Sequence, residues 1–109
     1  INEGPYCFCE QGRTFIAYSG AGSWCEDYCI AILELVGDDP MDASAWKKWD
    51  KPVLGSNSEF VGMGHCSVIE EDKTIFFHAW NADEKDIVWN TVYPIVAKYR
   101  LEGDEFIFE

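Results

Sequence analysis

The chain has few basic residues and no long apolar run. Its 109 residues include 8 Lys and Arg against 20 Asp and Glu, so the formal net charge is −12 at pH 7. Nucleic acid and anionic membrane surfaces would both meet like charge on such a protein. The longest apolar segment, 29–36, is interrupted by Glu34 and is far shorter than the roughly 20 residues of a membrane-spanning helix. We therefore expect neither a nucleic-acid partner nor a membrane partner.

The sequence also lacks an Asn-x-Ser/Thr glycosylation site and the two-residue Cys spacing of structural zinc sites. It has an odd number of cysteines, namely Cys7, Cys9, Cys25, Cys29 and Cys66. A zinc cluster is one alternative, since Cys7 and Cys9 would share a strand face and Cys66 follows His65. Buried, reduced thiols that pack as small apolar side chains are the favoured interpretation. Free thiols without a glycosylation site favour a cytoplasmic location over a secreted one.

An initial Met and a basic-then-apolar leader are absent as well, because the chain begins Ile1-Asn2-Glu3. This start indicates a processed product, an artificially expressed segment or a piece of a longer protein, and all three remain open. The composition is 48% hydrophobic and 16% aromatic, which excludes an intrinsically disordered chain. One small domain is expected, with more aromatic residues than its own core needs.

An internal repeat organises the sequence. Residues 4–19 align without a gap on residues 64–79, so that Gly4 matches Gly64 and Thr14 matches Thr74. Each copy predicts two strands joined by a polar turn, followed by a third and a fourth strand. The strands expected in the first copy are 6–9, 14–18, 28–33 and 52–54, and those in the second are 66–69, 74–78, 93–98 and 105–108. A helical turn is expected within 42–49.

Two successive four-stranded units of this length predict an all-β fold, namely two antiparallel blades of a β-propeller. The chain 1–109 would then be a single partial propeller domain, with blades of about 3–60 and 61–109. Two blades cannot close a ring, so each would present an unpaired apolar face. We therefore expect either missing propeller blades or a homo-oligomer as a partner.

Propellers carry their functional groups near the axis, where the innermost strands begin. Here these strands begin at Glu3-Gly4-Pro5 and at Gly62-Met63-Gly64-His65. Pro5 corresponds to His65 in the repeat. Glu3 lies two residues before Pro5 and therefore on the same strand face, so Glu3 and His65 would face one channel. The alternative for Glu3 is a solvated acid near a frayed terminus, and the alternative for His65 is a core histidine bonded to backbone.

An ordered set of motifs resembles glycoside hydrolase family 43, in its arabinofuranosidase and β-xylosidase-like branch. The motifs are Glu3-Gly4-Pro5, the segment 16–28 with Tyr18-Ser19-Gly20 and Asp27-Tyr28, Gly62-Met63-Gly64-His65, and Phe76-Phe77-His78-Ala79. The resemblance covers nearly the whole chain and implies the last two blades of that family's five-bladed propeller.

The resemblance also implies roles for particular residues. Glu3 takes the place of the general acid, and His65 that of a channel histidine that in many members helps to hold a calcium ion or its waters near the sugar. His78 matches a packing and hydrogen-bonding histidine. Trp24 would border the sugar pocket or fill a gap at the rim of a blade. An Arg that many members carry after this hairpin is missing from 86–93, and Arg100 comes too late to replace it.

Three hypotheses follow from these patterns. The first is the C-terminal piece of an inverting glycosidase acting on arabinose- or xylose-containing plant polysaccharides or oligosaccharides. It would carry the acid Glu3 but not the base, and the isolated chain would be inactive. Asp27, Asp38 and Asp39 are interpreted as solvated loop acids, not as a replacement base. The second is a non-catalytic carbohydrate-binding half-propeller, and the third is a module that assembles with copies of itself.

Overall fold

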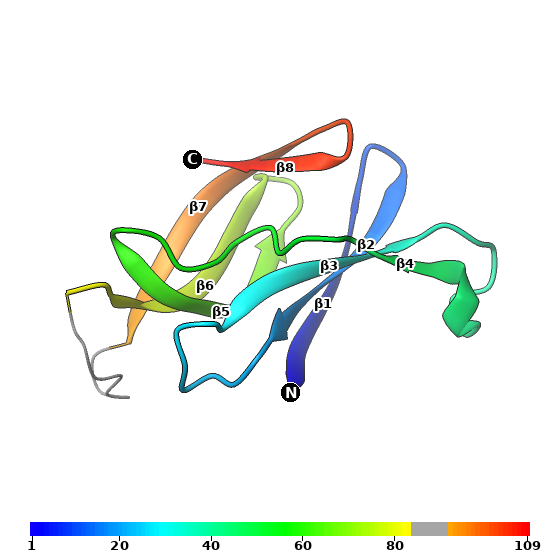
Figure 1. Ribbon diagram of the computed structural model, residues 1–109. Coiled ribbons are helices and arrows are strands. Elements are labelled where there is room, and N and C mark those ends of the chain that lie inside the picture. The colour runs from blue at the N-terminus through cyan, green and yellow to red at the C-terminus, as the bar shows by residue number, and fades with distance from the viewer. Residues whose placement is uncertain (84–91) are drawn as a thin grey trace.

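The chain folds into two antiparallel sheets. The computed structural model describes residues 1–83 and 92–109. The strands are β1 (Asn2–Glu10), β2 (Arg13–Gly20), β3 (Cys29–Leu35), β4 (Trp46–Lys48), β5 (Phe60–Ile69), β6 (Thr74–Asn81), β7 (Tyr93–Glu102) and β8 (Glu105–Phe108). Each sheet follows chain order, β1-β2-β3-β4 and β5-β6-β7-β8 (Figure 1). The all-β prediction of two four-stranded antiparallel sheets is confirmed.

The two sheets share one hairpin register. Cys7 pairs with Ile16 in the first sheet, and Ser67 pairs with Phe76 in the second, so that both partners move by the 60 residues of the sequence repeat. Both hairpins lose this register toward the start of their first strand. β1 has one irregularity, between Glu3 and Tyr6, and β5 has two, between Val61 and Ser67. These bulges re-aim the side chains at the beginning of each inner strand.

The fourth strand of the first sheet is not where the sequence predicted it. Residues Trp46–Lys48 form β4 and pair with Leu33–Leu35, whereas Leu54 makes only an isolated bridge to Ile30. The predicted helical turn shrinks to the 3-10 turn Ala43–Ala45, because Asp42 accepts a hydrogen bond from the Ser44 amide and caps it. This turn brings the chain back beside β3 earlier in the sequence than the predicted fourth strand at 52–54. Pro94, by contrast, lies near the start of β7, as predicted.

The hydrophobic core lies between the two sheets. Alternate side chains of the strands point inward, which is the period-2 pattern of a half-buried sheet. The buried members are Phe8, Phe15, Ala17, Ile30, Ile32, Met63, Cys66, Val68, Ile75, Phe77, Ala79, Tyr99, Leu101 and Phe106. The Phe15 ring packs edge-on against both Trp49 and Phe106, at centroid distances of 5.7 and 5.2 Å. Aromatic rings from both sheets therefore form one cluster.

Polar contacts also join the sheets at their hairpin end. Buried Glu10 accepts hydrogen bonds from the Lys73 ammonium at 2.6 and 2.9 Å. Arg13 forms an ion pair with Glu34 of its own sheet at 2.8 Å and another with Asp104 of the second sheet at 2.7 Å. A buried carboxylate without its cation would be strongly unfavourable, so these pairs fix how the hairpins meet.

The prediction of buried thiols is wrong for two of the five cysteines. Cys66 is buried, which raises its pKa to about 11, and Cys25 and Cys29 are half-buried. Cys7 and Cys9 are exposed because they alternate with the inward-facing Phe8 on β1. No group of three metal-binding side chains forms within 1–83 and 92–109, which removes the zinc alternative for the cysteines there. None of the helices in these ranges is long and apolar enough to span a bilayer.

The aromatic cluster predicts a large stability loss for Phe15→Ala. The fully buried Phe15 ring contacts Phe8, Trp49 and Phe106, so its removal leaves a cavity between the sheets. We expect the free energy of unfolding, measured by urea denaturation, to fall by about 3–5 kcal/mol. The exposed control Val96→Ala should change it by less than about 0.5 kcal/mol. Equal effects of the two substitutions would contradict a shared core at Phe15.

Candidate active site

The beginnings of β1 and β5 meet the ends of β2 and β6 at one edge of the molecule. Glu3 begins this region on β1, Ser19 ends β2, and Tyr28 precedes β3. His65 and His78 come from β5 and β6 of the other sheet. The edge lies at the opposite end of the strands from the Arg13 ion pairs. It therefore gathers one carboxylate, one phenol and two imidazoles from both sheets.

Tyr28 holds the Glu3 carboxylate. The Tyr28 side chain is fully buried, and its hydroxyl donates a 2.7 Å hydrogen bond to Glu3 Oε1. Burial, which outweighs an opposing hydrogen bond with Ser19, raises the pKa of Tyr28 to about 12, and the Glu3 carboxylate adds to this shift. Tyr28 is therefore protonated at neutral pH and remains a donor. One Glu3 oxygen is fixed in place, while Glu3 itself is only partly buried.

Gly64 makes room for the tyrosine. A Cβ atom at Gly64 would overlap the Tyr28 ring, and one at Gly62 would overlap the Trp80 ring. The two glycines of the Gly62-Met63-Gly64-His65 motif thus allow two aromatic rings to lie directly on the β5 backbone. This contact is the physical reason for small residues at these two positions.

His65 has an uncommon backbone conformation. Its φ of 55° is left-handed, which costs a residue with a Cβ of order 1–2 kcal/mol. The His65 amide donates a 2.6 Å hydrogen bond to Oγ of the buried Ser19, which holds this bulge. A Cβ at Gly4 would lie 3.2 Å from the His65 ring, so the imidazole packs over the glycine that follows Glu3. The Glu3-Gly4-Pro5 and Gly62-Met63-Gly64-His65 motifs are therefore in contact.

His78 lies between these groups. Its ring is stacked with Tyr28 at 5.8 Å and with His65 at 6.4 Å between centroids, and it meets Trp80 edge-on at 6.1 Å. Desolvation by burial, and then the nearby His65, lower the pKa of His78, although Glu3 acts in the opposite direction. His78 is thus neutral at pH 7. Its buried Nδ1 has no hydrogen-bond partner within the described residues.

The other predicted site residues lie apart from this cluster. Trp24 is 60% exposed in the loop before β3, where its indole packs against Gly22. Arg100 is bonded to Glu102 and Glu109. The acids Asp27, Asp38 and Asp39 are exposed in loops, and Asp39 accepts a hydrogen bond from the Met41 amide. Most of segment 86–93, which lacks the expected Arg, lies outside those residues, since they exclude 84–91.

The cluster does not supply a calcium shell. Calcium takes 6–8 oxygen ligands. The side chains here offer the Glu3 carboxylate, already bonded by Tyr28, and two imidazoles. Residues 1–83 and 92–109 contain no group of three His, Cys, Asp or Glu side chains arranged for a metal. The donors present thus do not fit calcium, and His65 would need oxygen ligands from elsewhere.

Sequence reasoning missed Tyr28 and Ser19 as parts of the site. Tyr28 was assigned to a strand, and its contact with Glu3 spans 25 residues of sequence. The available signal was Gly64, since a glycine within a strand often marks the close approach of another group. Nothing in the sequence indicated which group it would be.

The packing of Tyr28 on Gly64 predicts that Gly64→Ala is destabilising. The new methyl group must displace a fully buried ring, so the free energy of unfolding should fall by about 1–3 kcal/mol or more. Gly20→Ala is the matched control, because its Cβ would meet only ordinary contacts, the nearest 3.5 Å away. Urea denaturation of both variants checks this, and similar losses would show that the site has room for the methyl group.

The raised tyrosine pKa values predict alkaline instability. Burial raises the pKa of both Tyr28 and Tyr99 to about 12, whereas an unfolded tyrosine titrates near 10. Between these values the unfolded chain binds fewer protons, so the free energy of unfolding falls as pH rises from about 10 to 12. Denaturation across this range should show the decline, and Tyr28→Phe with Tyr99→Phe should reduce it. A decline that stays as steep in the double variant would refute this assignment.

Comparison with known proteins places this geometry in context. No protein-family model matches the chain. An extracellular exo-α-(1→5)-L-arabinofuranosidase of Streptomyces chartreusis is 34% identical over 86 residues, which are 72% of this chain and 26% of that protein. The crystal structure of an α-L-arabinofuranosidase from Lactobacillus brevis matches with a TM-score of 0.77 and 29% identity, over 96% of this chain and 35% of that one.

Two further structures share the fold. A thermostable family-43 glycoside hydrolase has a TM-score of 0.76 and 19% identity, over 99% of this chain and 35% of that one. An endo-1,4-β-xylanase from Bacteroides thetaiotaomicron has a TM-score of 0.73 and 21% identity, over 100% of this chain and 38% of that one. The chain thus spans 26% to 38% of these proteins. It is related to glycoside hydrolase family 43 and has the fold of part of that family's propeller.

Proposed function

We propose that this chain supplies the general acid of an inverting glycosidase that acts on arabinose- or xylose-containing polysaccharides or oligosaccharides. The observation that carries the proposal is the Glu3 carboxylate, held by buried Tyr28 at 2.7 Å beside His65 and His78. The names of the arabinofuranosidase relatives support the pentose substrate.

Glu3 has the geometry for proton donation. Tyr28 bonds Oε1, and no other hydrogen bond to Glu3 is formed within 1–83 and 92–109. The second oxygen, Oε2, can therefore carry the proton and give it to the departing glycosidic oxygen. Proton donation of this kind contributes about 10²–10⁴-fold to a reaction rate. The imidazoles of His65 and His78 would border the sugar without adding a competing carboxylate.

The chain does not complete the reaction alone. An inverting enzyme needs a second carboxylate, roughly 6.5–9.5 Å from the acid, to activate water on the other side of the bond. Within 1–83 and 92–109, the hydrogen bond to Glu3 comes from Tyr28 and not from a second carboxyl group. The base, and with it the rest of the substrate pocket, would come from the part of the propeller that this chain lacks. The isolated chain would then be inactive.

A chimera tests the acid role. In it, residues 1–109 replace the matching third of the Lactobacillus brevis arabinofuranosidase. We expect activity in the chimera and none in the isolated chain. Glu3→Gln should lower the rate about 10²–10⁴-fold on oligosaccharides but far less on dinitrophenyl glycosides, whose leaving group needs no proton. It should also remove the alkaline limb of the pH profile.

A binding-only module gives a different result. In that case Glu3→Gln would leave the hydrolytic rate of an active chimera unchanged on every substrate, which would overturn the acid assignment. Glu71→Gln, an exposed acid in the turn between β5 and β6, is the matched control and should keep full activity in either case. An equal loss on both classes of leaving group would indicate a structural role for Glu3.

A further inference from the structure

A cavity opens at the end of the strands opposite Glu3. Its volume is about 580 Å³, and it lies between β3–β4 of the first sheet and the β7–β8 hairpin of the second. Arg13 forms an ion pair with Glu34 and Asp104 at its edge, whereas Ser19 of the same strand contacts His65. Six residues along a strand correspond to about 20 Å. The cavity is therefore separate from the Glu3 region.

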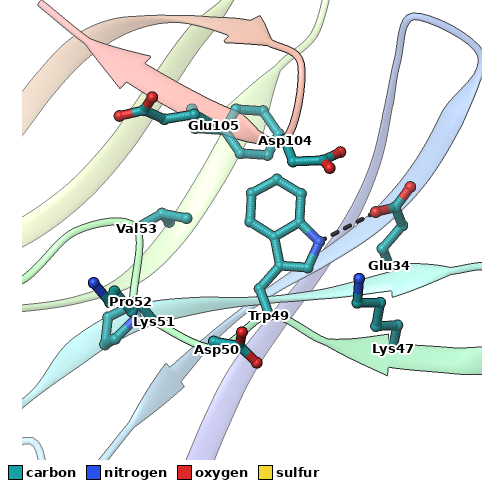
Figure 2. Close-up of a pocket in the computed structure, with 10 residues that line it drawn as sticks. Glu34, Lys47, Trp49, Asp50, Lys51, Pro52, Val53, Asp104 and Glu105 are labelled. Carbon is teal, nitrogen blue, oxygen red and sulfur yellow. Dashed lines mark hydrogen bonds between the residues drawn. The ribbon is translucent and has the colours of Figure 1, made fainter.

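Trp49 stands at the centre of this cavity (Figure 2). Its indole N–H donates a 3.1 Å hydrogen bond to Glu34 Oε1, and its ring packs on Phe106 at a centroid distance of 5.5 Å. Glu34 is itself fixed by two hydrogen bonds from Arg13, at 2.8 and 2.9 Å. The indole is thus held by these two contacts while it remains partly exposed, which provides an ordered apolar surface.

The polar groups around Trp49 include both hydrogen-bond donors and hydrogen-bond acceptors. Asp50 and Glu105 offer acceptors, and Lys47 and Lys51 offer donors (Figure 2). These four exposed side chains make no hydrogen bond or ion pair with the part of the chain that the structure describes. The remaining carboxylates, Glu34 and Asp104, are already paired with Arg13. The cavity therefore offers unoccupied donors and acceptors with almost balanced charge.

We propose that this cavity is a second carbohydrate site that takes a neutral oligosaccharide. A sugar presents an apolar C–H face, suited to the Trp49 ring, and hydroxyl groups that both donate and accept hydrogen bonds. The two lysines disfavour a polyamine, and the two free carboxylates disfavour a phosphorylated ligand. Binding here would hold a polymer at a point remote from Glu3 and raise its local concentration. The proposal does not depend on the role of Glu3.

Binding to the full 109-residue chain tests the site. The probes are xylohexaose and arabinohexaose, followed through the tryptophan indole N–H signals by NMR. We expect saturable shifts of the Trp49 signal with a Kd on the order of 1 mM. The charge-neutral pair Asp50→Ala with Lys51→Ala should weaken binding about tenfold, equivalent to about 1.4 kcal/mol. The matched pair Asp38→Ala with Lys48→Ala, exposed residues that do not line the cavity, should leave it unchanged.

Three outcomes would overturn the proposal. The first is an absence of saturable shifts at Trp49 with either hexasaccharide. The second is equal affinity in the Asp50/Lys51 variant and in its control. The third is tighter binding of spermine or tripolyphosphate than of both sugars, which would identify a charged ligand. Because none of these readouts involves Glu3 or hydrolysis, failure here is distinct from failure of the proposed acid.

Discussion

The close packing of Tyr28 on the Gly64 backbone is the contact on which the site depends. It brings a residue of the first sheet onto the inner strand of the second, where no Cβ could fit. Three features follow from it. The Tyr28 hydroxyl reaches Glu3, the Tyr28 ring stacks on His78, and His65 lies over Gly4. The bulges of β1 and β5 adopt left-handed backbone conformations that accommodate this arrangement, and Ser19 stabilises the bulge at His65. The catalytic proposal is thus a consequence of how two sheets approach each other.

The two ends of the strands contribute in different ways. At the hairpin end, the Glu10–Lys73 and Arg13–Asp104 pairs and the Phe15 cluster fix the sheets relative to each other. At the Glu3 end, the contacts are glycines, rings and single hydrogen bonds, which leave one carboxylate oxygen available. Rigid packing at one end and accessible polar groups at the other are what a positioned functional group requires. The cavity at Trp49 lies at this same hairpin end, and Arg13 is paired with two of the carboxylates that line it.

Much of the fold could be predicted from the sequence, because the repeat carries it. The 60-residue offset of the repeat reproduces the hairpin register that the two sheets share. The fourth strand at Trp46–Lys48 could not be predicted, since its position follows from how tightly the 3-10 turn at Ala43–Ala45 reverses the chain. The exposure of Cys7 and Cys9 was also missed, because small apolar residues give no sign of which face they occupy. Glu3 and His65 were found through motifs, but the Tyr28 contact needed three-dimensional packing.

A crystal structure of the Lactobacillus brevis chimera with a sulfur-linked, non-hydrolysable oligosaccharide would test the central claim most directly. The account predicts that Glu3 Oε1 keeps its hydrogen bond to Tyr28 while Oε2 lies within hydrogen-bonding distance of the bridging sulfur. It further predicts a carboxylate from the remainder of the propeller on the opposite side of the bond, roughly 6.5–9.5 Å from Glu3. A sugar bound in the channel with its bridging atom away from Glu3, and next to another acid, would contradict the account.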